Sequence, residues 1–233
     1  ASGSVPPFLL TAMAFAISGA LGLIWIAATG RWRDLHQPVR AWLLGVGGLF
    51  GFHFFYFTAL RGAPPVEASL IAYLWPLLIV VFSALLPGER LRWFHLAGAV
   101  LGLLGTVAVV SGGKAIAIDP AFALGYAAAL ASALTWATYS VLSRRMAVVP
   151  TGAVAGFCLA TAALSTFAHM VLEETAWPAT GPEWLAVLGL GLMPVGAAFY
   201  VWDHGVKHGD IQVLGAGAYA APLISTAVLI LAG

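Results

Sequence analysis

Residues 72–77 read Ala-Tyr-Leu-Trp-Pro-Leu and residues 218–223 read Ala-Tyr-Ala-Ala-Pro-Leu, so four of six residues recur at an interval of 146 positions. The same shift superimposes longer hydrophobic blocks without a gap, namely 7–29 on 153–175, 41–60 on 187–206 and 66–87 on 212–233. Identity outside the tyrosine and proline cluster is sparse, so the repeat is mainly one of hydropathy. The pattern predicts that the chain contains a duplicated unit.

The composition excludes a soluble globular domain. Of 233 residues, 61% are hydrophobic and 8% are charged, whereas soluble domains have roughly 45–50% apolar and about 25% charged residues. A net charge of +1 provides no basic surface for nucleic acid. The single cysteine, Cys158, excludes an intrachain disulfide and a thiolate metal site. These features predict an integral membrane protein.

Apolar stretches long enough to cross a bilayer make up most of the chain. A helix needs about 17–25 apolar residues to cross ~30 Å of hydrocarbon with its backbone groups hydrogen-bonded internally. The sequence contains eight such stretches: 7–29, 41–60, 66–87, 93–111, 121–143, 151–172, 183–206 and 210–232. The connectors are too short for a separate soluble domain. We therefore expect an all-α integral membrane protein that forms one transmembrane bundle.

Lysine and arginine are concentrated in alternate loops. One side of the membrane holds eight of the ten basic residues, and the other holds only Arg61 and Lys114. Because cytoplasmic loops are enriched in these residues, the eight-residue side is predicted to be cytoplasmic. The shift of 146 positions spans five crossings, which is an odd number. The two repeats are therefore predicted to have opposite orientations in the membrane.

The two expected inverted halves are residues 1–111 and 121–233, and each lacks one helix. The span 121–143 has no counterpart before residue 1, and the span 93–111 has none after residue 233. We therefore expect a complete protein of ten crossings with both termini in the cytoplasm, of which eight crossings are present in this chain. The alternative is an eight-span protein with an imperfect repeat.

Three features make the sequence similar to a known family. They are the tyrosine and proline cluster of each half, the turn Pro87-Gly88-Glu89-Arg90 before the span 93–111, and the pattern Gly125, Trp136, Tyr139 and Arg144. With these features the whole chain resembles the drug/metabolite transporter (DMT) superfamily, in particular its EamA-type permeases with two inverted five-helix halves. From Phe52 to Pro76 it most resembles the branch that exports aromatic amino acids.

The resemblance implies an alternating-access transporter in the bacterial inner membrane that exports small hydrophobic or aromatic metabolites, with aromatic amino acids as the expected substrates. The expected partners are this solute and the lipid bilayer. One alternative is a transporter of another metabolite class in the same superfamily. A membrane-embedded enzyme or a channel is a further alternative, but the sequence shows neither a nucleophile with a base nor a ring of charges. We expect no enzymatic activity and no cofactor.

Prolines near the middle of two spans mark the expected substrate site. Pro76 and Pro222 each remove one hydrogen bond from a membrane helix, and interrupted helices at matching places in inverted halves indicate a binding site at the bilayer midplane. A kink that only improves packing is the alternative. Aromatic and polar side chains near this depth complete the candidate site: Tyr56, His53, Tyr73, Trp75, Trp136, Tyr139 and Tyr219. Together they suit a ligand with a flat apolar body and a small polar head, although each alone is equally typical of an ordinary core.

Two other patterns are expected to be structural. Asp203 and Lys207 have the spacing of an ion pair within a helix, with proton coupling as the alternative role for Asp203. His204 and His208 have the spacing of a zinc pair, but no glutamate follows the first histidine. We therefore expect no metal site.

Overall fold

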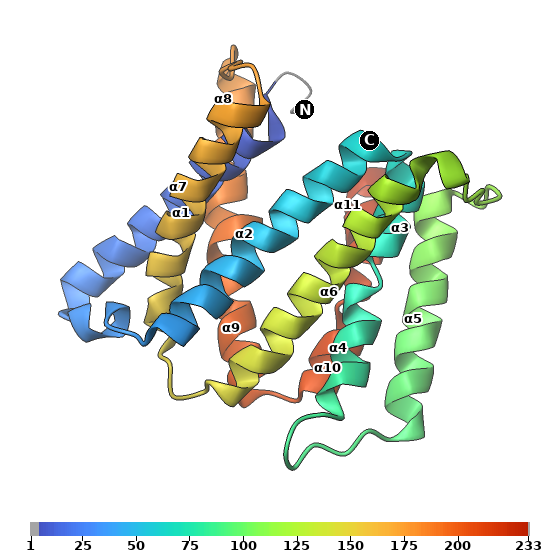
Figure 1. Ribbon diagram of the computed structural model, residues 1–233, viewed down its shortest axis with the longest axis horizontal. Helices are drawn as coiled ribbons and strands as arrows, with labels where there is room; N and C mark the ends of the chain where they lie inside the picture. Colours follow the sequence, from blue (N-terminus) through green and yellow to red (C-terminus); the bar gives the residue numbers. More distant parts are fainter. Residues whose placement is uncertain (1–4, 233) are drawn as a thin grey trace. The chain divides into compact units, whose positions relative to one another are not determined.

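The computed structural model describes residues 5–232, and the regular elements in this range are helices (Figure 1). The ends of the two expected halves, residues 1–4 and 233, lie outside the described residues. Eight helical segments of this range are long and apolar enough to cross a membrane: Pro7–Thr29, Val39–Gly62, Pro65–Ser83, Trp93–Ser111, Pro120–Arg145, Thr151–Leu172, Gly181–His208 and Ile211–Val228. They match the expected spans, so the predicted all-α, multi-pass membrane fold is confirmed.

Prolines and glycines set several of the helix ends. α1 (Pro7–Thr29) and α3 (Pro65–Ala72) both begin with proline, which lacks only an N–H that would be unpaired at this position anyway. α1 ends at Gly30 and α5 (Trp93–Ser111) ends at Gly112, where φ is 69° and 60°. This left-handed conformation closes a helix at little cost only for glycine.

The helices form two compact units that do not follow the two sequence halves. The first unit contains the described residues up to His53 together with Met146–Lys207, and the second contains Phe54–Arg145 together with the described residues from His208 onward. A shift of 146 positions carries residues 5–53 of the first unit onto 151–199 of the same unit, and residues 62–86 of the second unit onto 208–232 of the same unit. Each unit therefore combines helices that the sequence repeat relates to one another.

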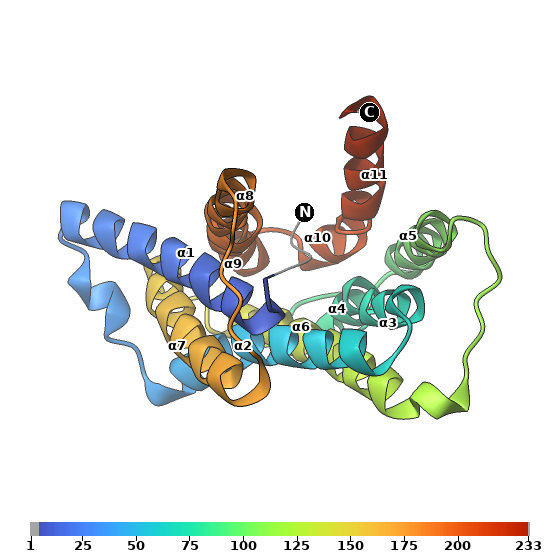
Figure 2. The ribbon, with the colours of Figure 1, turned by 90° about the horizontal axis from the view of Figure 1, so that it is seen from above.

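The first unit is built around α1 and α7, which lie side by side (Figures 1 and 2). α8 also packs against α1. The unit comprises α1, the 3₁₀ turn Trp32–Leu35, the first part of α2 (Val39–Gly62), the 3₁₀ turn Thr151–Ala153, α7 (Val154–Leu172), α8 (Gly181–Leu192), a π-helical turn at Met193–Ala197, and α9 (Ala198–His208) up to Lys207.

Two glycines at the repeat interval permit close helix contacts in the first unit. A Cβ atom at Gly45 would collide with the Phe157 ring of α7, and one at Gly191 would lie 2.8 Å from Cβ of Ile17 in α1. Gly45 and Gly191 are 146 residues apart. The two halves thus use equivalent glycines to pack against α7 and α1.

The second unit contains the interrupted helices. It comprises the end of α2, α3, α4 (Trp75–Ser83), α5, the 3₁₀ turn Pro120–Phe122, α6 (Ala123–Arg145), α10 (Ile211–Gly217) and α11 (Ala220–Ala232). α3 and α4 pack against α6, and α10 packs against α4 and α5. The breaks at 73–74 and 218–219 correspond to one another within one residue after a shift of 146 positions. The predicted interruption of both helices near Pro76 and Pro222 is confirmed.

A third interruption occurs in only one half. The span Gly181–His208 contains the π-helical turn Met193–Ala197, whereas its counterpart α2 runs as one α-helix from Val39 to Gly62. Pro194 lies within this turn and cannot donate a backbone hydrogen bond. A π-helical turn holds one residue more than an α-helical turn, and such turns occur frequently at functional sites.

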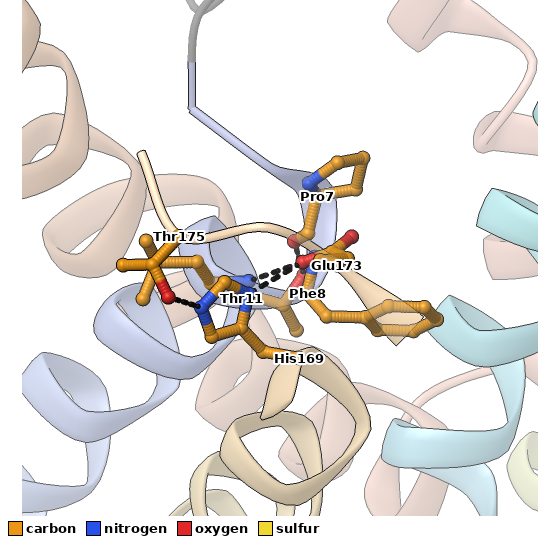
Figure 3. Close-up of polar contacts among 7 residues, drawn as sticks. Pro7, Phe8, Thr11, His169, Glu173 and Thr175 are labelled. Atoms are coloured by element: carbon orange, nitrogen blue, oxygen red, sulfur yellow. Dashed lines mark hydrogen bonds and ion pairs between the residues drawn. The ribbon is translucent and has the colours of Figure 1, made fainter. Parts of the chain in front are cut away.

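Glu173 caps α1 from the other half of the chain (Figure 3). The cap residue Pro6 has no side-chain acceptor, and the first turn contains no acidic residue. The Glu173 carboxylate accepts hydrogen bonds from the N–H groups of Phe8 at 3.0 Å and Leu9 at 3.2 Å. His169 lies between Glu173 Oε2, 2.8 Å from Nδ1, and Thr175 Oγ1, 2.9 Å from Nε2. The buried carboxylate thus satisfies backbone donors that the helix cannot satisfy itself.

Replacement of Glu173 by glutamine is expected to lower the free energy of unfolding by about 1.5–3 kcal/mol, the usual contribution of hydrogen bonds to a charged group. Thermal unfolding in detergent micelles measures this loss. The matched control is Glu174→Gln at the exposed neighbouring residue, with an expected effect within about 0.5 kcal/mol. Equal unfolding midpoints for the two variants would contradict the capping role.

A buried ion pair joins α9 to the segment that precedes α7. Lys207 Nζ donates to Asp203 Oδ2 at 2.7 Å and to the Val149 carbonyl at 2.9 Å, and the Thr151 hydroxyl donates to the same carboxylate oxygen at 2.7 Å. Asp203 is 2% exposed and Lys207 is 7% exposed. The ion pair expected from the spacing is therefore present, and it is more deeply buried than a surface pair.

Replacement of Asp203 by asparagine is expected to cost about 3–5 kcal/mol, because it leaves the Lys207 ammonium buried without a counter-charge. The double variant Asp203→Leu, Lys207→Met removes both charges and is expected to be more stable than the single variant. Chemical denaturation in detergent compares them. A double variant as unstable as Asp203→Asn would show that the loss does not come from an unpaired charge.

Candidate functional site

Three of the predicted site residues form one aromatic group in the second unit. The Trp75 and Trp136 rings meet edge to face with centroids 6.3 Å apart, and the Trp136 and Tyr139 centroids are 5.2 Å apart. Trp75 is the first residue of α4, directly after the break, whereas Trp136 and Tyr139 lie one turn apart on α6. Trp136 and Tyr139 are buried and Trp75 is half-buried. The break therefore presents an indole beside the aromatic side chains of α6.

Tyr56 lies on α2 within the same unit. Its hydroxyl hydrogen-bonds the Ser69 hydroxyl of α3 at 3.2 Å, and the Tyr56 side chain is half-buried. This contact holds the Tyr56 phenol of α2 against α3, the helix that ends directly before Tyr73. The hydroxyl pair provides both a donor and an acceptor next to the break.

The two tyrosines of the sequence repeat contact each other directly. The Tyr219 hydroxyl donates a hydrogen bond to the Tyr73 carbonyl at 3.0 Å and accepts one from the Leu77 N–H at 3.2 Å. Tyr219 is 2% exposed, and Pro76 and Pro222 are also buried. The Tyr219 hydroxyl is therefore fully engaged with the backbone of the first half.

His53 belongs to the first unit, whereas the other eight predicted residues belong to the second. Its Nδ1 lies 2.7 Å from the Leu49 carbonyl, to which it donates. Around the imidazole lie the rings of Phe15, Phe52 and Phe199, at centroid distances of 5.1, 5.2 and 6.2 Å. The first unit thus has its own aromatic group, centred on a histidine.

Sequence reasoning did not identify Phe15 and Phe199 as members of this group, nor Tyr200, which packs against α1 in the same unit. Phe199 lies 146 residues after His53, so the repeat itself could have indicated it. The Tyr200 hydroxyl donates to the Ser18 carbonyl at 3.2 Å, next to Gly22, which has no Cβ to exclude it. No sequence pattern indicates Phe15 or this tyrosine, because their positions depend on how α1 packs in the first unit.

The chemistry available to both groups is that of recognition and not of bond cleavage. Aromatic rings bind flat apolar surfaces through stacking and edge contacts, while phenol, indole and free backbone groups bind small polar groups. Within residues 5–232, no group of three or more histidine, cysteine, aspartate or glutamate side chains is arranged to hold a metal ion.

The model of the EamA-like transporter family matches residues 1–111 and 123–232. The chain belongs to this family. The double match shows that the domain is duplicated, as the sequence repeat predicts, and it confirms the predicted family. Membership in the EamA-like family makes the protein a transporter and not an enzyme.

Relatives and a solved structure agree with this assignment. The chain is 57% identical to the aromatic amino acid exporter YddG of Ancylobacter novellus, over 100% of this chain and 81% of that protein. It is 27% identical to the aromatic amino acid exporter YddG of Salmonella typhimurium, over 70% of this chain and 57% of that protein. A crystal structure of a protein with 56% identity matches with a TM-score of 0.96, covering 100% of this chain and 80% of that chain.

Replacement of Trp75 by alanine is expected to lower the transport rate about tenfold, which corresponds to ~1.4 kcal/mol, because it removes an aromatic surface at the break. Initial rates in proteoliposomes measure the effect. The matched control is Trp93→Ala at the start of α5, where the indole is 80% exposed, and its rate is expected to equal that of the wild type. If Trp75→Ala transports as fast as this control, Trp75 is not part of the site.

Proposed function

We propose that the protein exports aromatic amino acids across the bacterial inner membrane by alternating access. The observation that carries this proposal is the aromatic group of Trp75, Trp136 and Tyr139 at an interrupted helix, in a chain 57% identical to an aromatic amino acid exporter. The eight predicted residues of the second unit remain the proposed substrate-binding set, in which Tyr219 acts through the backbone of the break. Their chemistry fits a ligand with an aromatic side chain. His53, which belongs to the first unit, remains a separate prediction.

The proposed site also offers partners for the zwitterionic head of an amino acid. Pro76 has no N–H, so the Ala72 carbonyl is released from the helix and can accept a hydrogen bond from an ammonium group. The half-helices α4 and α11 both begin at a break, and the N-terminal end of a helix favours a carboxylate. Backbone groups thus replace charged side chains as the recognition elements for the head group.

We propose that residues 1–111 and 121–233 are two inverted halves that alternate the access of this site. Support comes from contacts at the repeat interval. The Tyr219 hydroxyl donates a hydrogen bond to the Tyr73 carbonyl, and the equivalent glycines Gly45 and Gly191 pack against α7 and α1. In inverted-repeat transporters, the two halves exchange conformations between the two access states.

Reconstitution into liposomes tests the function. Radiolabelled phenylalanine or tryptophan is expected to cross with a saturable rate, and unlabelled aromatic amino acids are expected to compete better than alanine or lysine. Equal competition by non-aromatic metabolites would assign the transporter to another substrate class. A flux that rises in proportion to concentration would indicate a channel, and both results would contradict the proposal.

A further inference from the structure

The Tyr219 hydroxyl occupies the place of one backbone hydrogen bond in the first half. In an uninterrupted α-helix, the Leu77 N–H would donate to the Tyr73 carbonyl four residues earlier. Here the helix is broken between α3 and α4, and the Tyr219 hydroxyl lies between the two groups, 3.2 Å from the Leu77 nitrogen and 3.0 Å from the Tyr73 oxygen. A hydroxyl is suited to this position because it donates and accepts at once.

The membrane environment makes this insertion energetically important. An unpaired backbone group in hydrocarbon costs several kcal/mol, and Pro76 already removes one donor from this turn. Without the hydroxyl, the Leu77 N–H and the Tyr73 carbonyl lose their partner in the open break. Tyr219 therefore stabilises the break and holds the backbone on which Trp75 begins α4.

The Tyr219 ring is held firmly enough to define the position of its hydroxyl. It packs with Val80 and Ala99 in a buried cluster. Gly102 of α5 lies against the ring, and a Cβ atom at this position would lie 2.6 Å from Tyr219 Cδ2. The glycine of α5 thus leaves room for the Tyr219 ring to pack against the helix backbone.

The sequence repeat contains the same elements with the roles exchanged. Tyr73 lies 146 residues before Tyr219, and the break of the second half lies at residues 218–219. The groups equivalent to the Tyr73 carbonyl and the Leu77 N–H are the Tyr219 carbonyl and the Leu223 N–H. The Tyr73 hydroxyl makes no hydrogen bond within the part of the chain that the structure describes, so the observed contact is one-sided.

We propose that Tyr219 and Tyr73 are reciprocal positioning residues of the transport cycle. In the observed conformation, the Tyr219 hydroxyl is inserted in the break of the first half. In the opposite access state, the Tyr73 hydroxyl is inserted in the break of the second half, between the Tyr219 carbonyl and the Leu223 N–H. The proposal rests on the alternating access of the proposed function, because inverted repeats exchange their conformations between access states.

Hydrogen–deuterium exchange of the purified protein in detergent tests the exchange of roles without any substrate. Tyr219→Phe keeps the ring but removes the inserted hydroxyl. We expect the Leu77 amide to exchange about tenfold faster in this variant and the Leu223 amide to exchange more slowly, because the population moves toward the opposite state. The added substitution Tyr73→Phe is expected to abolish the new protection at Leu223.

A purely structural role for Tyr219 would affect Leu77 alone. Unchanged exchange at Leu223 in Tyr219→Phe, or protection there that persists in the double variant, would overturn the proposal. Far-UV circular dichroism confirms that each variant remains helical. If wild-type liposomes fail to transport aromatic amino acids, the proposed substrate is wrong, while the exchange measurement still decides the roles of the two tyrosines.

Discussion

A carbonyl and an N–H group inside a membrane helix must each find a hydrogen-bond partner, because the surrounding hydrocarbon offers none. In this protein the Tyr73 carbonyl and the Leu77 N–H are both satisfied by the Tyr219 hydroxyl. This contact lies at the start of α4, two residues from Trp75, whose ring meets Trp136 edge to face. Gly102 makes this contact possible, because a side chain at this position would collide with the Tyr219 ring.

The sequence predicts those parts of the fold that depend on local properties. Hydropathy and length are sufficient to identify the eight spans, and a proline in the middle of a span is sufficient to indicate a break. The interval of 146 positions then relates the break near Pro76 to the break near Pro222. The duplicated domain of the EamA-like family matches this repeat.

The sequence does not predict contacts between side chains that are distant in the chain. The sequence indicates only that Glu173 is an acidic residue in a loop. In the structure its carboxylate caps a helix that begins 166 positions earlier, at Pro7. The depth of Trp75 and Trp136 in their spans suggests a common level but not ring contact. The sequence predicts that Tyr219 contacts the substrate. In the structure its hydroxyl forms hydrogen bonds with the Tyr73 carbonyl and the Leu77 N–H. In each case the contact depends on how neighbouring helices pack, and hydropathy does not predict this packing.

The wide turn at Met193–Ala197 changes how the two halves compare beyond it. It adds one residue to a helix whose counterpart, α2, has no such turn, so the following side chains are rotated by about 100°. Lys207, which lies beyond this turn, is buried, whereas Arg61, its partner in the alignment, is exposed. The two copies align without a gap along the sequence, but beyond the π-helical turn of the second copy their side chains differ in direction around the helix axis.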